Sequence, residues 1–140
     1  NIMEKEISEQ WQKNKPKLEE YFKTTKQEEY STYQSIVEKI FEICITKADS
    51  YNKWNYKNIT CVDDGDYQGT QIFLIPKDTY QPSADEYLVT NTYYGSCSGC
   101  DTLEAISRYE DGLPSEEQLK DYMTLALHLV QKTKYLYPQD

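Results

Sequence analysis

The chain lacks long apolar runs and the motifs around which most catalytic sites are built. Its longest nearly apolar runs, residues 72–75 and 125–130, fall far short of the ~20 residues that a transmembrane helix needs. The sequence contains no G-x-x-x-x-G-K-[ST], no G-x-G-x-x-G, no G-x-S-x-G and no H-E-x-x-H. We therefore expect a soluble protein with no membrane partner, no enzymatic activity and no cofactor.

Basic residues are scarce in the middle of the chain. The net charge is −9, and residues 58–121 carry 13 acidic against 3 basic residues, so this segment holds the whole excess. Such a balance speaks against direct nucleic-acid binding and favours a cationic partner. An acidic surface kept only for solubility is the alternative.

Aromatic residues are plentiful. The mean hydropathy is low, at −0.85, but 14 Tyr, 3 Phe and 2 Trp bury a large area per residue. A chain of 140 residues is one domain's worth, so we expect a single folded domain over residues 1–140.

Two helical segments are predicted in the N-terminal part. An apolar stripe (Ile7, Trp11, Leu18, Tyr21, Phe22) is interrupted by Pro16, which indicates either two helices or one kinked helix. Thr25 and Glu28 form a Thr-x-x-Glu capping box. The apolar residues that follow at three- and four-residue spacing predict a helix to about Ala48: Tyr30, Tyr33, Val37, Ile40, Phe41 and Cys44.

Three strands are predicted next, at residues 59–62, 70–75 and 87–94, because β-branched and aromatic residues dominate there. Asp64 and Gly65 predict a tight hairpin turn with positive φ between the first two. Alternation places Ile72 and Leu74 on one face of the second strand and Phe73 and Ile75 on the other. Since both faces are apolar, we expect this strand to be central and covered on both sides.

Two more helices are predicted after the strands. Leu103, Ile106 and Tyr109 indicate a short helix that stops at Gly112. Ser115 and Gln118 open a long helix whose middle is apolar almost all round, so its His128 is expected to be a core residue. The predicted fold class is α+β, a three-stranded antiparallel β-meander packed with N-terminal and C-terminal helices in the order ααβββαα.

The turn between the third predicted strand and the short helix has the most closely spaced structural motifs in the sequence. Gly95 and Gly99 supply positions that tolerate positive φ around Cys97 and Cys100, and Asp101 with Glu104 forms an Asp-x-x-Glu capping box. We interpret Gly95, Cys97, Gly99 and Cys100 as a structural turn.

Two other interpretations of the cysteines remain, a redox dithiol and a zinc site. A Cys-x-x-Cys before a helix is typical of a redox dithiol, but no strand with a proline follows it as a thioredoxin-like fold requires. Cys97 and Cys100 could also hold zinc, although the other candidate ligands, Cys44, Cys61 and His128, are isolated in the sequence. The acidic run 63–66 lacks the EF-hand pattern for calcium.

We predict that an acidic, Tyr-rich surface binds a basic protein site and that it could mimic nucleic acid. Its candidate residues are Asp63, Asp64, Asp66, Asp85, Glu86, Asp101, Glu104, Glu110 and Asp111, with Glu116 and Glu117 beside them. If the surface acts as a unit, these carboxylates must gather on one side of the fold.

The segments 63–70 and 95–103 (DDGDYQGT and GSCSGCDTL) resemble small uncharacterised acidic proteins encoded by phages and prophages of low-GC Gram-positive bacteria. The resemblance implies the cytoplasm of a bacterial host cell, where thiols stay reduced. It also implies an inhibitor or counter-defence protein that blocks a basic host or defence protein. The alternatives are an immunity-type protein that neutralises a basic toxin, and a zinc-stabilised or thiol-active domain that uses Cys97 and Cys100.

Overall fold

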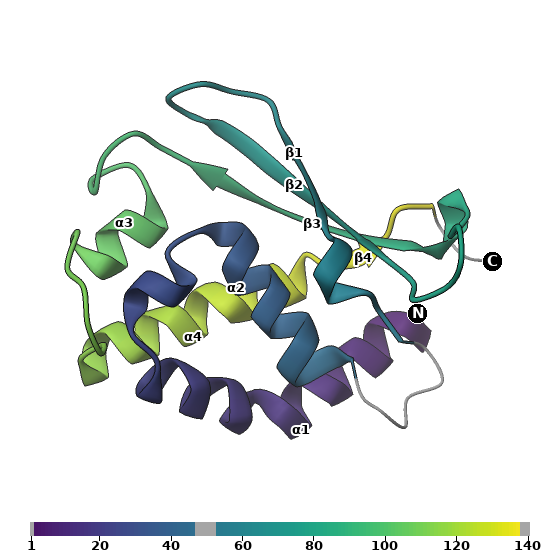
Figure 1. The fold of residues 1–140 in the computed structure, drawn as a ribbon, viewed down its shortest axis with the longest axis horizontal. Coiled ribbons are helices and arrows are strands. Elements are labelled where there is room, and N and C mark those ends of the chain that lie inside the picture. The colour runs from purple at the N-terminus through teal and green to yellow at the C-terminus, as the bar shows by residue number, and fades with distance from the viewer. Residues whose placement is uncertain (1, 47–52, 138–140) are drawn as a thin grey trace.

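An antiparallel sheet lies across a layer of helices, and the helices cover one of its two faces (Figure 1). The structure is a computed structural model that describes residues 2–46 and 53–137. Its helices are α1 (Ile2–Thr24), α2 (Tyr33–Lys39), α3 (Thr102–Ser107) and α4 (Glu116–Gln131), and the strands are β1 (Thr60–Asp63), β2 (Gly69–Pro76), β3 (Tyr87–Tyr94) and β4 (Lys134–Tyr135). The predicted α+β class, with an antiparallel meander and helices at both ends, is confirmed.

Within the described residues the sheet has four strands, where the sequence predicted three. Their order is β1-β2-β3-β4, and every neighbouring pair is antiparallel. The added strand β4 is two residues long and pairs Tyr135 with Leu88 and Lys134 with Val89. A two-residue strand is too short to show alternation, so only its pairing with β3 reveals it.

The central strand β2 is covered on one face only. Phe73 and Ile75 are fully buried beneath the helices, and Leu88 of β3 lies beside Ile75. Ile72 and Leu74 on the other face are half-buried, and Val62 of β1 is 47% exposed. The predicted alternation is confirmed, but the prediction that both faces are covered is wrong because all the helices pack on the same side.

Helix α1 is continuous through Pro16. Pro16 is exposed, while Ile7, Trp11, Leu18 and Phe22 of the predicted stripe are buried against the rest of the helical layer. The alternative of one helix is therefore correct, and the apolar stripe sets which side of it faces the core.

The second predicted helix begins later than its sequence indicates. The Thr25–Glu28 box does not start it; residues Gln27–Tyr30 form a 3₁₀ turn (η1), and Thr32 caps α2 by accepting a hydrogen bond from Ser35 N. The Glu28 carboxylate instead accepts a hydrogen bond from Gly112 N at 2.8 Å. Beyond α2 the chain continues as a π-helix (η2, Ile40–Ile45), and the predicted end near Ala48 lies outside the described residues.

Helix α3 ends earlier than predicted, and α4 is less buried than predicted. Helix α3 ends at Ser107, because Arg108 already has a φ of 53°, and so it stops before Gly112. The Ser115–Gln118 capping box of α4 is confirmed. His128 is exposed, so the prediction of a core histidine is wrong, and α4 buries one face instead of its whole circumference. None of the described helices has the length and apolar character needed to cross a membrane.

Candidate functional site

The predicted acidic residues lie toward two opposite ends of the sheet, except for Asp101, which is buried in the loop before α3. Asp85 and Glu86 belong to a 3₁₀ turn (η4, Ala84–Glu86) just before β3, whereas the loop of residues 95–101 follows that strand. Eight strand residues at about 3.3 Å each separate the two ends by roughly 25 Å. A single surface therefore does not contain all nine residues.

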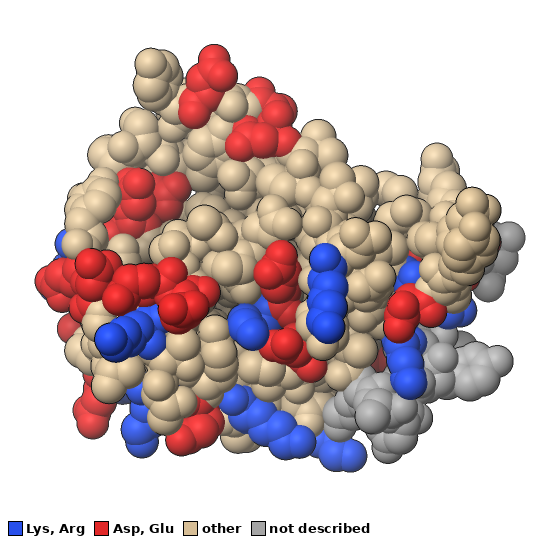
Figure 2. All heavy atoms as spheres, in the orientation of Figure 1, with Lys and Arg blue, Asp and Glu red and all other residues tan. Residues whose placement is uncertain are grey.

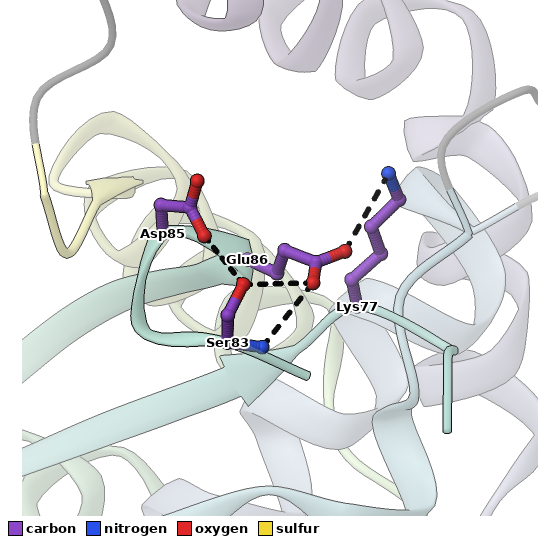
Figure 3. Close-up of polar contacts among 4 residues, drawn as sticks. All are labelled: Lys77, Ser83, Asp85 and Glu86. Atoms are coloured by element: carbon purple, nitrogen blue, oxygen red, sulfur yellow. Dashed lines mark hydrogen bonds and ion pairs between the residues drawn. The ribbon is translucent and has the colours of Figure 1, made fainter. Parts of the chain in front are cut away.

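Asp85 and Glu86 stabilise the η4 turn. The Ser83 hydroxyl lies 2.6 Å from Asp85 Oδ1 and 2.9 Å from Glu86 Oε1, and Glu86 Oε1 also accepts from Ser83 N at 3.2 Å (Figure 3). The other oxygen of Glu86 lies 3.9 Å from Lys77 Nζ. These carboxylates are thus used within the turn that precedes β3.

Asp101 lies in the interior. It is 6% exposed, and its carboxylate accepts hydrogen bonds from Tyr33 OH (2.7 Å), Gly95 N (2.9 Å) and Glu104 N (3.1 Å). The cap predicted for α3 is thereby confirmed on the Asp101 side. All this hydrogen bonding is internal, so Asp101 positions the turn and takes no part in an exposed acidic surface.

The remaining acids gather at one end of the molecule, which we call the acidic end: Asp63, Asp64, Asp66, Glu104, Glu110, Asp111, Glu116 and Glu117, joined by Glu28. They lie at the end of β1 and on the β1–β2 loop, on η1, on α3 and the loop after it, and on the first turn of α4, toward the left of Figure 1. Acidic side chains dominate this end in Figure 2, while lysines gather along the lower edge, where α1 runs. The two ion pairs found within residues 2–46 and 53–137, Lys39–Glu42 and Lys77–Glu86, involve none of these acids.

A pocket of about 340 Å³ opens at the acidic end between α3, the loop after it, η1 and α4. Its lining includes four carboxylates, those of Glu28, Glu104, Glu110 and Asp111, and none of the described residues that line it is Lys or Arg. Tyr109 stands at its edge, 68% exposed, with its hydroxyl donating to Glu104 Oε2 at 2.9 Å. The pocket is therefore suited to a cationic group.

Tertiary contacts keep two parts of the pocket in place. Gly112 N donates to Glu28 across 84 residues of chain, and this hydrogen bond lowers the pKa of the Glu28 carboxyl, so its negative charge persists to lower pH. The buried Tyr122 hydroxyl donates to Gln27 Oε1 at 2.7 Å, and burial raises the pKa of Tyr122 to about 12. The sequence did not indicate Glu28 as a site residue, because Glu28 is far from α3 in the chain and no sequence pattern connects the two.

The β1–β2 loop forms the upper rim of the acidic end. It spans residues 64–68, so the predicted two-residue turn is wrong, and Gly65 does not have the predicted positive φ. Asp63 accepts from Tyr94 OH at 2.6 Å and from Gly65 N at 3.0 Å, and these hydrogen bonds lower the pKa of its carboxyl. Tyr67 is 83% exposed at the tip.

The Cys97–Cys100 turn precedes α3, which contributes residues to the pocket lining. Cys100 N donates to Cys97 O at 3.0 Å, both thiols are exposed and free, and neither Gly95 nor Gly99 has positive φ. Gly95 is required for another reason: a Cβ there would collide with Cys100 O and lie 2.7 Å from its carbonyl carbon. A Cβ at Gly99 would lie 3.9 Å from the nearest heavy atom, Cys97 Sγ, so steric crowding requires glycine at position 95 and not at position 99.

Within the part of the chain that the structure describes, no three His, Cys, Asp or Glu side chains are grouped so that they could hold a metal ion. Cys44 is buried in the core, Cys61 is half-buried on β1 and His128 is exposed on α4. Among the described residues, therefore, none joins Cys97 and Cys100 as a third ligand, and no calcium-type group forms at Asp63, Asp64 and Asp66.

Comparison with protein-family models, with curated proteins and with solved structures finds no match to this chain.

Proposed function

We propose that the protein is a non-enzymatic binding module whose acidic end holds a basic site of another protein. The observation that carries this proposal is the pocket walled by Glu28, Glu104, Glu110 and Asp111, in which no lining cation neutralises the four carboxylates. A lysine or arginine side chain of a partner supplies the missing positive charge.

The geometry favours arginine over lysine. A guanidinium group has five N–H donors in one plane and can pair with two carboxylates at once, whereas an ammonium group is a point charge. The exposed ring of Tyr109 at the pocket edge offers a face for cation–π contact with the same group.

The surroundings extend the attraction beyond the pocket. Five further carboxylates lie at the same end: Asp63 at the end of β1, Asp64 and Asp66 on the β1–β2 loop, and Glu116 and Glu117 on α4. Their summed field steers a basic surface toward the pocket. Tyr67, at the tip of the β1–β2 loop, adds an aromatic contact of the kind enriched in interfaces. The resemblance to phage-encoded proteins supports a basic host, defence or toxin protein as the partner, blocked at a nucleic-acid-binding cleft.

A pair of charge reversals tests the proposal. E110K/D111K changes two exposed pocket carboxylates, while the matched control E6K/E9K changes two exposed carboxylates near the start of α1, at the other end of the molecule. A partner recovered by affinity capture from a bacterial lysate is titrated with each protein at low and high salt. We expect E110K/D111K to weaken binding at least about tenfold at low salt and E6K/E9K to leave it nearly unchanged, with both melting temperatures preserved.

Two outcomes would contradict the proposal. Equal binding by E110K/D111K and the unchanged protein would show that the pocket is not the contact. Wild-type binding that is insensitive to salt would show that charge does not drive the complex, because exposed charges are screened over about 10 Å at 0.1 M ionic strength.

A further inference from the structure

The two exposed thiols are presented on a firmly held base. Asp101 closes the loop of residues 95–101 by accepting Gly95 N at 2.9 Å, and its other oxygen is held by Tyr33 OH and Glu104 N. The residues between, which include Cys97 and Cys100, project into solvent. The two thiols can therefore react while hydrogen bonds to Asp101 hold the ends of the loop.

The backbone of the turn already suits a disulfide. The 3.0 Å hydrogen bond from Cys100 N to Cys97 O closes a four-residue turn, in which the first and last Cα atoms lie within about 7 Å. A disulfide joins Cα atoms about 4.4–6.8 Å apart. Bridging Cys97 and Cys100 thus needs rotation of side chains and little movement of the backbone.

The hydrogen bonds make the two sulfurs unequal. Cys97 N donates to Cys100 Sγ at 2.9 Å. The Cys100 thiol donates to Cys97 O at 3.2 Å, and the interaction between the two side chains lowers the pKa of Cys100 and raises that of Cys97. Neither cysteine belongs to α3, which begins at Thr102 with Asp101 as its N-cap. These contacts favour Cys100 as the thiol that attacks the substrate first and Cys97 as the thiol that attacks in the second step.

We propose that the Cys97–Cys100 turn is a thiol–disulfide exchange site whose substrates are low-molecular-weight disulfides such as oxidised glutathione. The Cys100 thiolate attacks one sulfur of the substrate, an S–S bond forms, and one thiolate leaves. Cys97 then gives its proton to the first thiolate released and attacks the Cys100 sulfur. The S–S bond of the mixed disulfide breaks, and the second thiolate leaves and takes up a proton from solvent. The protein dithiol is oxidised by two electrons and the substrate disulfide is reduced to two thiols. This site does not depend on the acidic pocket.

The other two cysteines serve as internal controls. Cys44 is fully buried, and burial, with the charge of Asp63 second, raises the pKa of Cys61. Trypsin cleavage after Lys77 and Arg108 releases a peptide of residues 78–108 that contains Cys97 and Cys100 and no other cysteine. Its mass therefore reports the state of this pair alone.

The test equilibrates the native full chain with mixtures of reduced and oxidised glutathione, quenches with acid and measures that peptide. We expect wild type to lose two hydrogen atoms as a Cys97–Cys100 disulfide without accumulating the glutathione adduct. C97S should accumulate the adduct on Cys100, and C100S should react more slowly than C97S, because it lacks the thiol whose pKa is lowered. Circular dichroism confirms that each variant is folded.

A second measurement needs no variant. Native wild-type protein is alkylated with limiting iodoacetamide, and the modified positions are mapped; Cys100 should react before Cys97 and well before Cys61. Persistence of the glutathione adduct in wild type, absence of the 97–100 disulfide under oxidised glutathione, or equal alkylation of Cys97 and Cys100 would each overturn the proposal.

Discussion

Tyr33 of α2 donates a 2.7 Å hydrogen bond to Asp101 Oδ1 across 68 residues of chain, and the same hydroxyl accepts from Leu103 N at 3.1 Å. Both side chains are buried, and burial raises the pKa of Tyr33, which keeps its proton available to Asp101. One buried contact therefore joins the helical layer to the loop of residues 95–101 and to the start of α3.

This contact predicts strong coupling between the two residues. Asp101→Ala should lower the free energy of unfolding by about 2–4 kcal/mol, because it removes a helix cap and leaves buried donors unpaired. Tyr33→Phe should cost about 1 kcal/mol. Urea unfolding of both variants and the double variant completes a cycle, and the two losses should fail to add by at least about 0.5 kcal/mol. Additive losses would contradict the coupling.

The glycines of the loop should respond differently to the same change. Gly95→Ala places a Cβ against the Cys100 carbonyl and should cost about 1–3 kcal/mol, whereas Gly99→Ala enters open space and should stay within about 0.5 kcal/mol. Urea denaturation of both proteins measures the difference. A larger loss at Gly99 would mean that steric crowding at Gly95 does not set the shape of this loop.

The two faces of β2 should also differ. Phe73→Ala removes a fully buried ring and should cost about 3–5 kcal/mol. Leu74→Ala, on the half-buried outer face, should cost about 1–2 kcal/mol, because much of its surface already contacts water. Equal losses in chemical denaturation would indicate that something covers the outer face.

The β1–β2 loop should weaken in acid. The pKa of Asp63 is lowered first of all by the Tyr94 hydroxyl, so its carboxylate contributes stability above its unfolded pKa, and this contribution is lost as the pH falls below about 4 through the folded value. Tyr94→Phe should raise the Asp63 pKa, followed by NMR of its carboxyl carbon. Tyr67→Phe, at an exposed ring on the same loop, is the matched control and should leave that pKa unchanged.

The sequence by itself determined those elements whose signals are local and repeated. The apolar stripe of α1, the Ser115–Gln118 cap of α4 and the alternation of residues 72–75 each follow from a helical or strand period, which any packing partner must respect. The acidic excess of residues 58–121 was likewise visible, and so was the Asp101 cap of α3.

Tertiary structure alone decided where those elements meet. Glu28 accepts a hydrogen bond from Gly112 N instead of completing the predicted Thr25–Glu28 capping box. His128 is exposed because α4 buries only one face, and β4 is recognised as a strand only by its pairing with β3. The acidic pocket has the same origin, since Glu28 and Asp111 lie far apart in the sequence. Long-range contacts of this kind leave no local period, so the sequence could supply the charges but not their arrangement.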